Sequence, residues 1–279
     1  MLLAAVLLQA SIAAPAFAPP LGTPLRIVTE RIETSPAERR YRLERLVRFS
    51  REGAGYRAEA VLLTNASAAP EALGNLVERG LSALAGRTIV LHLDERGQVT
   101  TVDEMAALWE RVCQRIAEAA ATRPGLSADA ASAKLVAPLR ALPPERQRAL
   151  LATLVTAAIM TDPREPPGSF IPVRLPGASP FGTPVTLEGT RRTATADNGL
   201  IRASTTASAT IDLPAQAGAP ARTGSVSLDR QRAFDPRTGM LSTATDTIRN
   251  VNGTGPAARE TLLVTRIRIE NADSAAWPD

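Results

Sequence analysis

Two long stretches of this sequence alternate apolar and polar residues with a period of two, and this pattern restricts the fold more than any other feature. In 39–50, one set of alternate positions holds Tyr41, Leu43, Val47 and Phe49. In 201–213, one set is apolar or small and the other is polar. A period of two places successive side chains on opposite faces of a strand. We therefore expect half-buried β-strands that each need a covering layer.

Turn sequences separate the expected strands, so neighbours along the chain should pair as hairpins. Asn198 and Gly199 tolerate the positive φ angles of a tight hairpin turn, and 94–97 has a similar composition. Before the centre of the chain we expect strands at 25–32, 39–50, 56–64, 88–93 and 98–102. After it we expect one strand ahead of 197–199, followed by 201–213, 223–234, 240–250 and 258–270. A capping box at 35–38 leaves a short helix as the alternative to the second strand.

Helical periodicity replaces the alternation in two parts of the chain. Leu73, Leu76, Val77, Leu81 and Leu84 lie at helical spacing between Pro70 and Gly86. A helix from 104 to 121 has the apolar face Met105, Leu108, Trp109, Val112 and Ile116. A short helix carrying Leu135, Val136 and Leu139 and a longer one from Pro144 to Met160 should follow. Such helices need a surface on which to dock, and one face of the sheet is the available partner.

These patterns predict an α+β fold: a curved antiparallel β-sheet, a half-barrel of about ten strands, with helices inserted mid-chain and packing on its apolar face. Within one domain over 19–279, we place a first strand group at 24–103, a helical insert at 104–161 and a second strand group at 170–270. The Pro- and Gly-rich stretch 162–184 is interpreted as a linker or an extended edge.

The N-terminal residues 1–18 resemble a signal peptide, which indicates a periplasmic or secreted protein. Leu2 to Leu8 form an apolar run that is too short to span a bilayer, and we expect no transmembrane span. Small residues flank Phe17 ahead of Pro19, and a cut after Ala13 or Ala14 is an alternative to one after Ala18. The other interpretation is an apolar N-terminus of a cytosolic protein.

Composition excludes several classes of function. With one histidine and one cysteine, the chain cannot build a Cys/His zinc site, and we expect no cofactor. Cys113 lies at helical spacing beside apolar residues and is expected to be buried. His92 is expected on the solvent side of its strand, and a Ser-His-Asp arrangement would have to combine it with Asp94. The motifs of hydrolases and phosphate-binding loops are absent from the sequence, so an enzyme, such as a carboxylate-based hydrolase, is the weaker hypothesis.

The basic residues do not indicate nucleic-acid binding. The net charge is +4, and of the 32 Lys and Arg residues only Lys134 is a lysine. The arginines are spread along the chain beside Asp and Glu, without the aromatic interleaving of a nucleic-acid surface. We expect no nucleic-acid partner.

The late segment FDPRTGMLSTATDTI (234–248), together with the leader-like N-terminus and the helices inserted in a meander, resembles the periplasmic lipoprotein-carrier half-barrels, the class that includes LolA. The resemblance implies a non-enzymatic carrier that shelters an apolar ligand, such as an acyl chain, between sheet and helices. The candidate lining residues are Met105, Leu108, Trp109, Ile201, Ala203, Ala207 and Ile211. One alternative is that the helices pack tightly and leave no cavity. The other is an envelope scaffold that binds a protein partner through a sheet edge or its Arg-rich strand faces.

Overall fold

The computed structural model describes residues 17–35, 37–63, 76–121, 132–159, 165–215 and 221–278. The strands are β1 (Leu25–Thr34), β2 (Glu38–Glu52), β3 (Gly55–Leu62), β4 (Thr88–Leu93), β5 (Val99–Val102), β6 (Phe170–Ala178), β7 (Pro184–Thr195), β8 (Ile201–Leu213), β9 (Arg222–Asp235), β10 (Met240–Asn252) and β11 (Arg259–Asn271). The α-helices are α1 (Leu76–Leu81), α2 (Met105–Ala121), α4 (Ala137–Arg140) and α5 (Pro144–Thr156), and a π-helical turn, Ser132–Val136, precedes α4.

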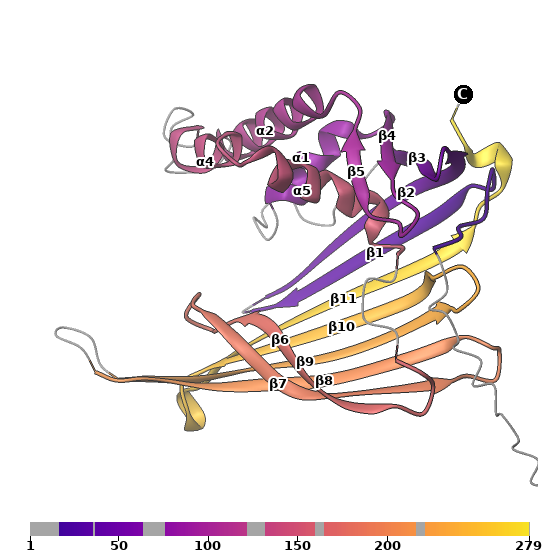
Figure 1. The fold of residues 1–279 in the computed structure, drawn as a ribbon. Helices are drawn as coiled ribbons and strands as arrows, with labels where there is room; N and C mark the ends of the chain where they lie inside the picture. The colour runs from indigo at the N-terminus through magenta and orange to yellow at the C-terminus, as the bar shows by residue number, and fades with distance from the viewer. Residues whose placement is uncertain are drawn as a thin grey trace, which may run out of the picture.

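The described strands form one antiparallel sheet in the order β5-β4-β3-β2-β1-β11-β10-β9-β8-β7-β6. The first and last strands of the chain therefore meet in the middle, where Leu25 to Thr34 pair with Asn271 to Leu262. This pairing joins the two strand groups into one curved, unclosed sheet (Figure 1). The expected α+β half-barrel is confirmed, with 11 strands rather than about ten.

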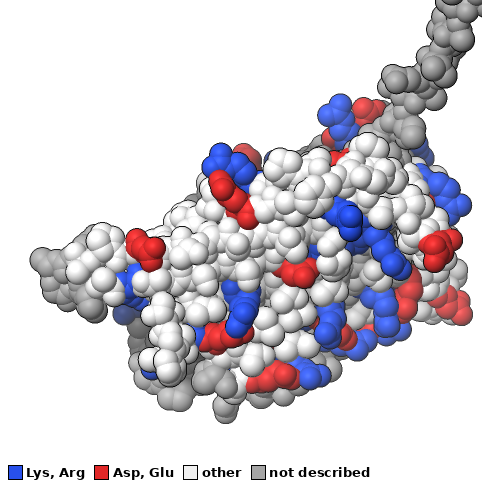
Figure 2. Space-filling view, turned by 90° about the horizontal axis from the view of Figure 1, so that it is seen from below, with Lys and Arg blue, Asp and Glu red and all other residues white. Residues whose placement is uncertain are grey.

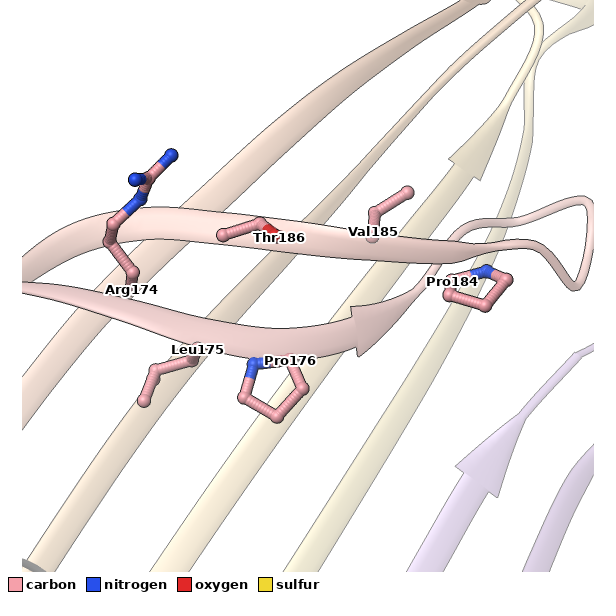
Figure 3. A pocket seen from close by; sticks show the side chains of 6 residues that line it. All are labelled: Arg174, Leu175, Pro176, Pro184, Val185 and Thr186. Carbon is pink, nitrogen blue, oxygen red and sulfur yellow. The ribbon is translucent and has the colours of Figure 1, made fainter.

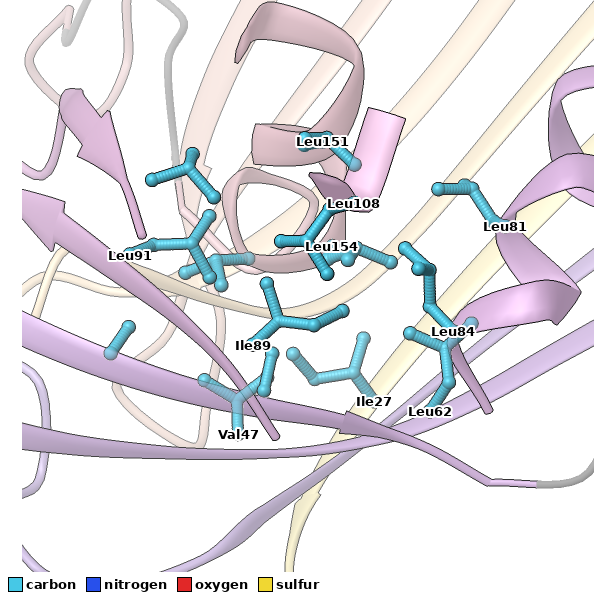
Figure 4. Close-up of a cluster of buried hydrophobic side chains, with 14 of the residues drawn as sticks. Ile27, Val47, Leu62, Leu81, Leu84, Ile89, Leu91, Leu108, Leu151 and Leu154 are labelled. Carbon is cyan, nitrogen blue, oxygen red and sulfur yellow. The ribbon is translucent and has the colours of Figure 1, made fainter. Parts of the chain in front are cut away.

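The helices cover one face of β1–β5, which we call the inner face of the sheet (Figure 1). Leu108, Trp109, Val112, Cys113 and Ile116 on α2 are buried, as the helical spacing predicted. They belong to a core with strand residues such as Ile89 and Leu91, which are at most 1% exposed. Figure 4 shows the labelled strand side chains of this core facing those of the helices. We call it the helix core.

One charged residue lies inside the helix core. The inward set of β2 is Tyr41, Leu43, Arg45, Val47 and Phe49, and Arg45 is only 1% exposed. Its Nε donates to the Leu154 carbonyl at 2.5 Å, and its Nη1 donates to Thr29 Oγ1 at 3.1 Å. Burial lowers the pKa of Arg45 to about 10, so the side chain stays charged at neutral pH. Arg45 thus ties the end of α5 to the middle of the sheet.

The outer face carries charges of both signs. Arg42 pairs with Glu44 at 3.1 Å, and Arg249 pairs with Glu260 at 2.7 Å. Burial alone would raise the pKa of Glu44, but hydrogen bonds from Arg42 and Arg26 outweigh it and hold that pKa below its usual value. Seen from the side opposite the helices, acidic and basic side chains are interspersed on a mostly uncharged surface (Figure 2). This view shows no extended area of a single sign.

The remaining features expected from the sequence agree with the structure apart from small differences. The strands at 25–32, 39–50, 201–213, 223–234, 240–250 and 258–270 are present, which decides the choice at 39–50 in favour of a strand. The additional strand is β6, an edge strand within the stretch interpreted as a linker or extended edge. Cys113 is buried. The expected leader up to residue 16, Leu73 and Met160 lie outside the described residues.

Candidate functional site

The hairpin formed by β6 and β7 crosses the inner face of the C-terminal strands. β7 pairs with β8 only from Glu188 to Thr195, and its first residues, Pro184 to Leu187, leave the ladder. At the departure point is Gly189, where a Cβ atom would lie 1.9 Å from the Thr206 carbonyl oxygen. Only glycine fits this approach without moving the backbone. The hairpin passes in front of the longer strands in Figure 1.

Beneath this hairpin lies an apolar cluster that contains no helix residue among the described parts of the chain. Leu187, Ala207, Val226 and Leu228 are 2% to 7% exposed, and we call them the hairpin cluster. Partly buried side chains of the hairpin and of β8 and β10 pack against it: Leu175, Val185, Ala209, Ile211 and Ile248. The N-terminal half of the inner face is thus covered by helices, and part of the C-terminal half, at the hairpin cluster, is covered by a hairpin of the same sheet.

The tip of the hairpin is held in place by short polar contacts. Ser179 Oγ accepts hydrogen bonds from the backbone N–H groups of Phe181 and Thr183 at 3.2 and 3.1 Å. The guanidinium of Arg222 on β9 lies 4.3 Å from the centre of the Phe181 ring. A cation over an aromatic ring contributes about 0.5–2 kcal/mol. Ser179 therefore fixes the turn at the tip, and the tip contacts β9 at Arg222 and Gly224.

Two hollows adjoin the hairpin. One of about 420 Å³, the tip hollow, lies between the hairpin tip and β10–β11. Its lining is polar: Ser35, Ser179, Pro180, Gly182, Asn250, Asn252, Arg259 and Thr261. The Asn250 Oδ1 atom is buried without a hydrogen-bond partner among the described residues, so a donor from a bound molecule would be favourable there. The second hollow, of about 650 Å³, runs along the hairpin between the six residues labelled in Figure 3.

Ion pairs separate the hairpin cluster from the helix core. The register places Asp246, Arg230, Thr205 and Arg191 in one row across β10, β9, β8 and β7 on the inner face. Arg191, 3% exposed, donates to Thr205 Oγ1 and pairs with Glu165, both at 3.1 Å. Arg230 pairs with Asp246 at 3.1 Å. Charged groups therefore lie on the inner face between the hairpin cluster and the helix core, and such a zone does not favour an apolar chain.

The sequence-based lining residues fall into separate places. Met105, Leu108 and Trp109 pack in the helix core, where Trp109 Nε1 donates to the Leu139 carbonyl at 3.1 Å. Ile201 belongs to a small cluster with Phe234, Leu241 and Ala244, and Ala203 is buried on the same face. Ala207 and Ile211 lie under the hairpin. The structure therefore does not bring the seven candidates together at one place.

The sequence reasoning missed the residues that cover the hairpin end. Leu175, Val185 and Leu187 come from the Pro- and Gly-rich stretch and from the strand after it. The signal that was available is the alternation of Ile171, Val173 and Leu175 with Pro172, Arg174 and Pro176. Because of its prolines and glycines the stretch was interpreted as a linker or an extended edge, and β6 is indeed an edge strand.

His92 lies on the outer face, as its alternation predicted. It is held between Glu52 and Asp103, with its Nε2 atom 3.0 Å from Asp103 Oδ1. Hydrogen bonds to Glu52 and then Asp103 raise the pKa of His92. Asp94 instead accepts from the backbone N–H groups of Arg96 and Gln98 at 2.9 and 2.8 Å, so its carboxylate caps the β4–β5 turn and does not orient the imidazole.

Comparison with known proteins adds no assignment, because no family model, no curated protein and no solved structure matches this chain. Within the described ranges, no helix is both long and apolar enough to cross a membrane. The same residues contain no group of three or more His, Cys, Asp or Glu side chains placed to hold a metal ion.

Proposed function

We propose that this protein is an exported, periplasmic carrier without enzymatic activity, and that it shelters an apolar ligand such as an acyl chain between the β6–β7 hairpin and the inner face of β8–β10. The observation that carries the proposal is the hairpin cluster, because its cover is a two-stranded hairpin instead of the helices. Beyond Gly189, the hairpin is attached to the sheet mainly at its tip. Moving this part of the hairpin away from the sheet would disturb neither the helix core nor the central ladder. Movement of the hairpin would expose an apolar strip to a ligand.

The composition of this region supports a chain-like ligand. Ala207 and Ala209 alternate on β8 with polar outward residues, so the inner floor is smooth and apolar. The tip hollow lies at the end of the hairpin and offers polar partners, among them the buried Asn250 Oδ1. A ligand with an apolar chain and a hydrogen-bonding end would match an apolar floor that leads to a polar hollow.

Chain length gives a quantitative test of this proposal. Burial of one methylene is worth about 0.8 kcal/mol, which is about a fourfold change in affinity. We expect the affinity for a series of saturated fatty acids to rise about fourfold per added carbon until the space under the hairpin is filled. An affinity that does not depend on chain length would contradict a site for an apolar chain.

A matched pair of variants locates the ligand. Ala207→Phe places a ring beneath the hairpin, where it would occupy the position of the proposed ligand, whereas Ser208→Phe places the same ring on the exposed outer face of the same strand. Native protein purified from the periplasm should release an acyl species into an organic extract, detected by mass spectrometry. The Ala207 variant should lose that species and the Ser208 variant should keep it. Folded wild-type protein with an empty extract would overturn the proposal.

The scaffold alternative has less support. Prolines in a paired strand are tolerated where the missing N–H would face away from the partner strand. Pro172 and Pro176 therefore stand at two positions whose backbone nitrogen faces the free side of β6, where neither can donate a hydrogen bond to an added strand. Between them, the added strand would lie beside Arg174. Arginines on the outer face of the Arg-rich strand, such as Arg42 and Arg48, already pair with glutamates. Envelope crosslinking to a protein partner, lost on neutralising 39–50, would favour the scaffold.

A further inference from the structure

Phe17, which lies inside the leader-like segment, is part of the folded core. Its side chain is 2% exposed. Its ring packs edge-on against Phe49 and Tyr56, with centroid separations of 5.7 and 5.2 Å. The Tyr56 hydroxyl donates to the Phe17 carbonyl at 2.8 Å. A cut after Ala18 would remove this ring and leave two aromatic side chains facing an empty space.

The backbone around Phe17 is equally integrated. The Ala18 N–H donates to the Thr238 carbonyl at 2.9 Å, which ties the segment to the β9–β10 turn. The Gly22 N–H donates to the Phe49 carbonyl at 2.9 Å. Gly97 has a φ of +79°, and a Cβ atom there would lie 2.9 Å from the Phe17 ring. The β4–β5 turn thus provides the room that the ring occupies.

The residues before Phe17 offer a processing site that keeps it. Ala14 and Ala16 place small residues at the third and first positions before the Ala16–Phe17 bond, which is the pattern of signal-peptide cleavage. The Ala18–Pro19 bond also has small residues at these positions, Ala16 and Ala18, but its nitrogen belongs to a proline ring, which disfavours cleavage there.

We infer that the exported chain is cut at the Ala16–Phe17 bond, so that Phe17 becomes the first residue and fills the core. This inference rests on the proposed export. Water adds across the amide, the C–N bond breaks, Ala16 gains a carboxylate and Phe17 gains the free α-amino group. The position differs from the boundary after Ala18 that the sequence suggested.

The mature N-terminus tests the cut directly. The full chain is expressed with its own leader in a Gram-negative host, and the periplasmic and cytosolic fractions are examined by intact mass and N-terminal sequencing. A periplasmic chain that begins at Phe17 is expected. A folded periplasmic chain that begins at Pro19, or one that begins upstream of Phe17, overturns the assigned bond. An unprocessed chain found only in the cytosol overturns the export proposal instead.

A stability comparison tests the role of Phe17 without depending on export. Two purified proteins, starting at Phe17 and at Pro19, differ only in the first two residues. We expect the shorter one to unfold about 10 °C lower. In the longer protein, Phe17→Ala should cause a similar loss, and Phe17→Leu a smaller one. The matched control is Leu21→Ala, because Leu21 in the same segment is 52% exposed and should leave the melting temperature unchanged. Equal melting temperatures for the two starts would overturn the structural role of Phe17.

Discussion

Arg45 offers a prediction whose size follows from its contacts. Arg45→Ala leaves the Leu154 carbonyl and the Thr29 hydroxyl without their donor and opens a void where the methylenes of the side chain packed. Each hydrogen bond from a charged group contributes about 1.5–3 kcal/mol, and the two lost methylenes, Cγ and Cδ, add about 1.6 kcal/mol. Against this, burial lowers the pKa of Arg45 to about 10, which means that desolvation of the charge costs about 3 kcal/mol.

These contributions predict different losses of stability for two substitutions of Arg45. We expect Arg45→Ala to lower the free energy of unfolding by about 3 kcal/mol, and Arg45→Met, which refills the void without a charge, to lower it by about 1 kcal/mol. Arg40→Ala is the control on the same strand, because Arg40 is exposed and pairs with Glu38 at the surface, and it should change the stability by at most about 1 kcal/mol. Urea unfolding followed by circular dichroism measures all three. A methionine variant as unstable as the alanine variant would refute the reasoning, since the void would then not matter.

Three further perturbations test separate parts of the structure. Gly189→Ala should displace the hairpin, because its Cβ would meet the Thr206 carbonyl at 1.9 Å; we expect faster amide hydrogen exchange in β6 and β7 with the helix core unchanged, and unchanged exchange in the hairpin would contradict this. The raised pKa of His92 means that its interaction with the two carboxylates stabilises the fold at pH below about 6.5 and is lost as the pH rises through the folded pKa. His92→Gln should therefore lower the free energy of unfolding at pH 5.5 by up to about 1 kcal/mol and by less at pH 8.5. An equal loss at both pH values would contradict a stabilising interaction of charged His92 with Glu52 and Asp103. Replacing Pro172 and Pro176 with threonine restores N–H donors to the free edge of β6 and should produce dimers in light scattering; a strictly monomeric double variant would show that the prolines do not protect this edge.

The overall architecture was predictable because it depends on local patterns. Alternation along β2, β8 and β11 identified strands that need one covered face, and the spacing on α2 identified the helix face that covers it. Short turns made neighbouring strands pair. The junction of the two strand groups through β1 and β11 is a contact between distant parts of the chain, which these local signals do not specify.

The details that matter for the candidate site were not predictable, because they depend on contacts between distant residues. Arg45 occupies an inward position of β2, and its burial depends on a carbonyl 109 residues further along the chain. Leu187 is buried because β7 leaves its ladder at Gly189, and no periodicity marks that departure. In the sequence, Phe17 resembles part of a leader. Only the fold shows that Tyr56 and Gly97 pack around it.

The most direct test of the carrier proposal is to map where a ligand binds. A fatty acid that bears a photoreactive diazirine near its methyl end is bound to the native protein, irradiated, and the modified peptides are identified by mass spectrometry. We predict labels on the hairpin cluster, in the peptides that contain Leu187, Ala207 and Leu228. Labels confined to the helices, or no labelling that an unlabelled fatty acid can displace, would contradict a ligand site under the hairpin.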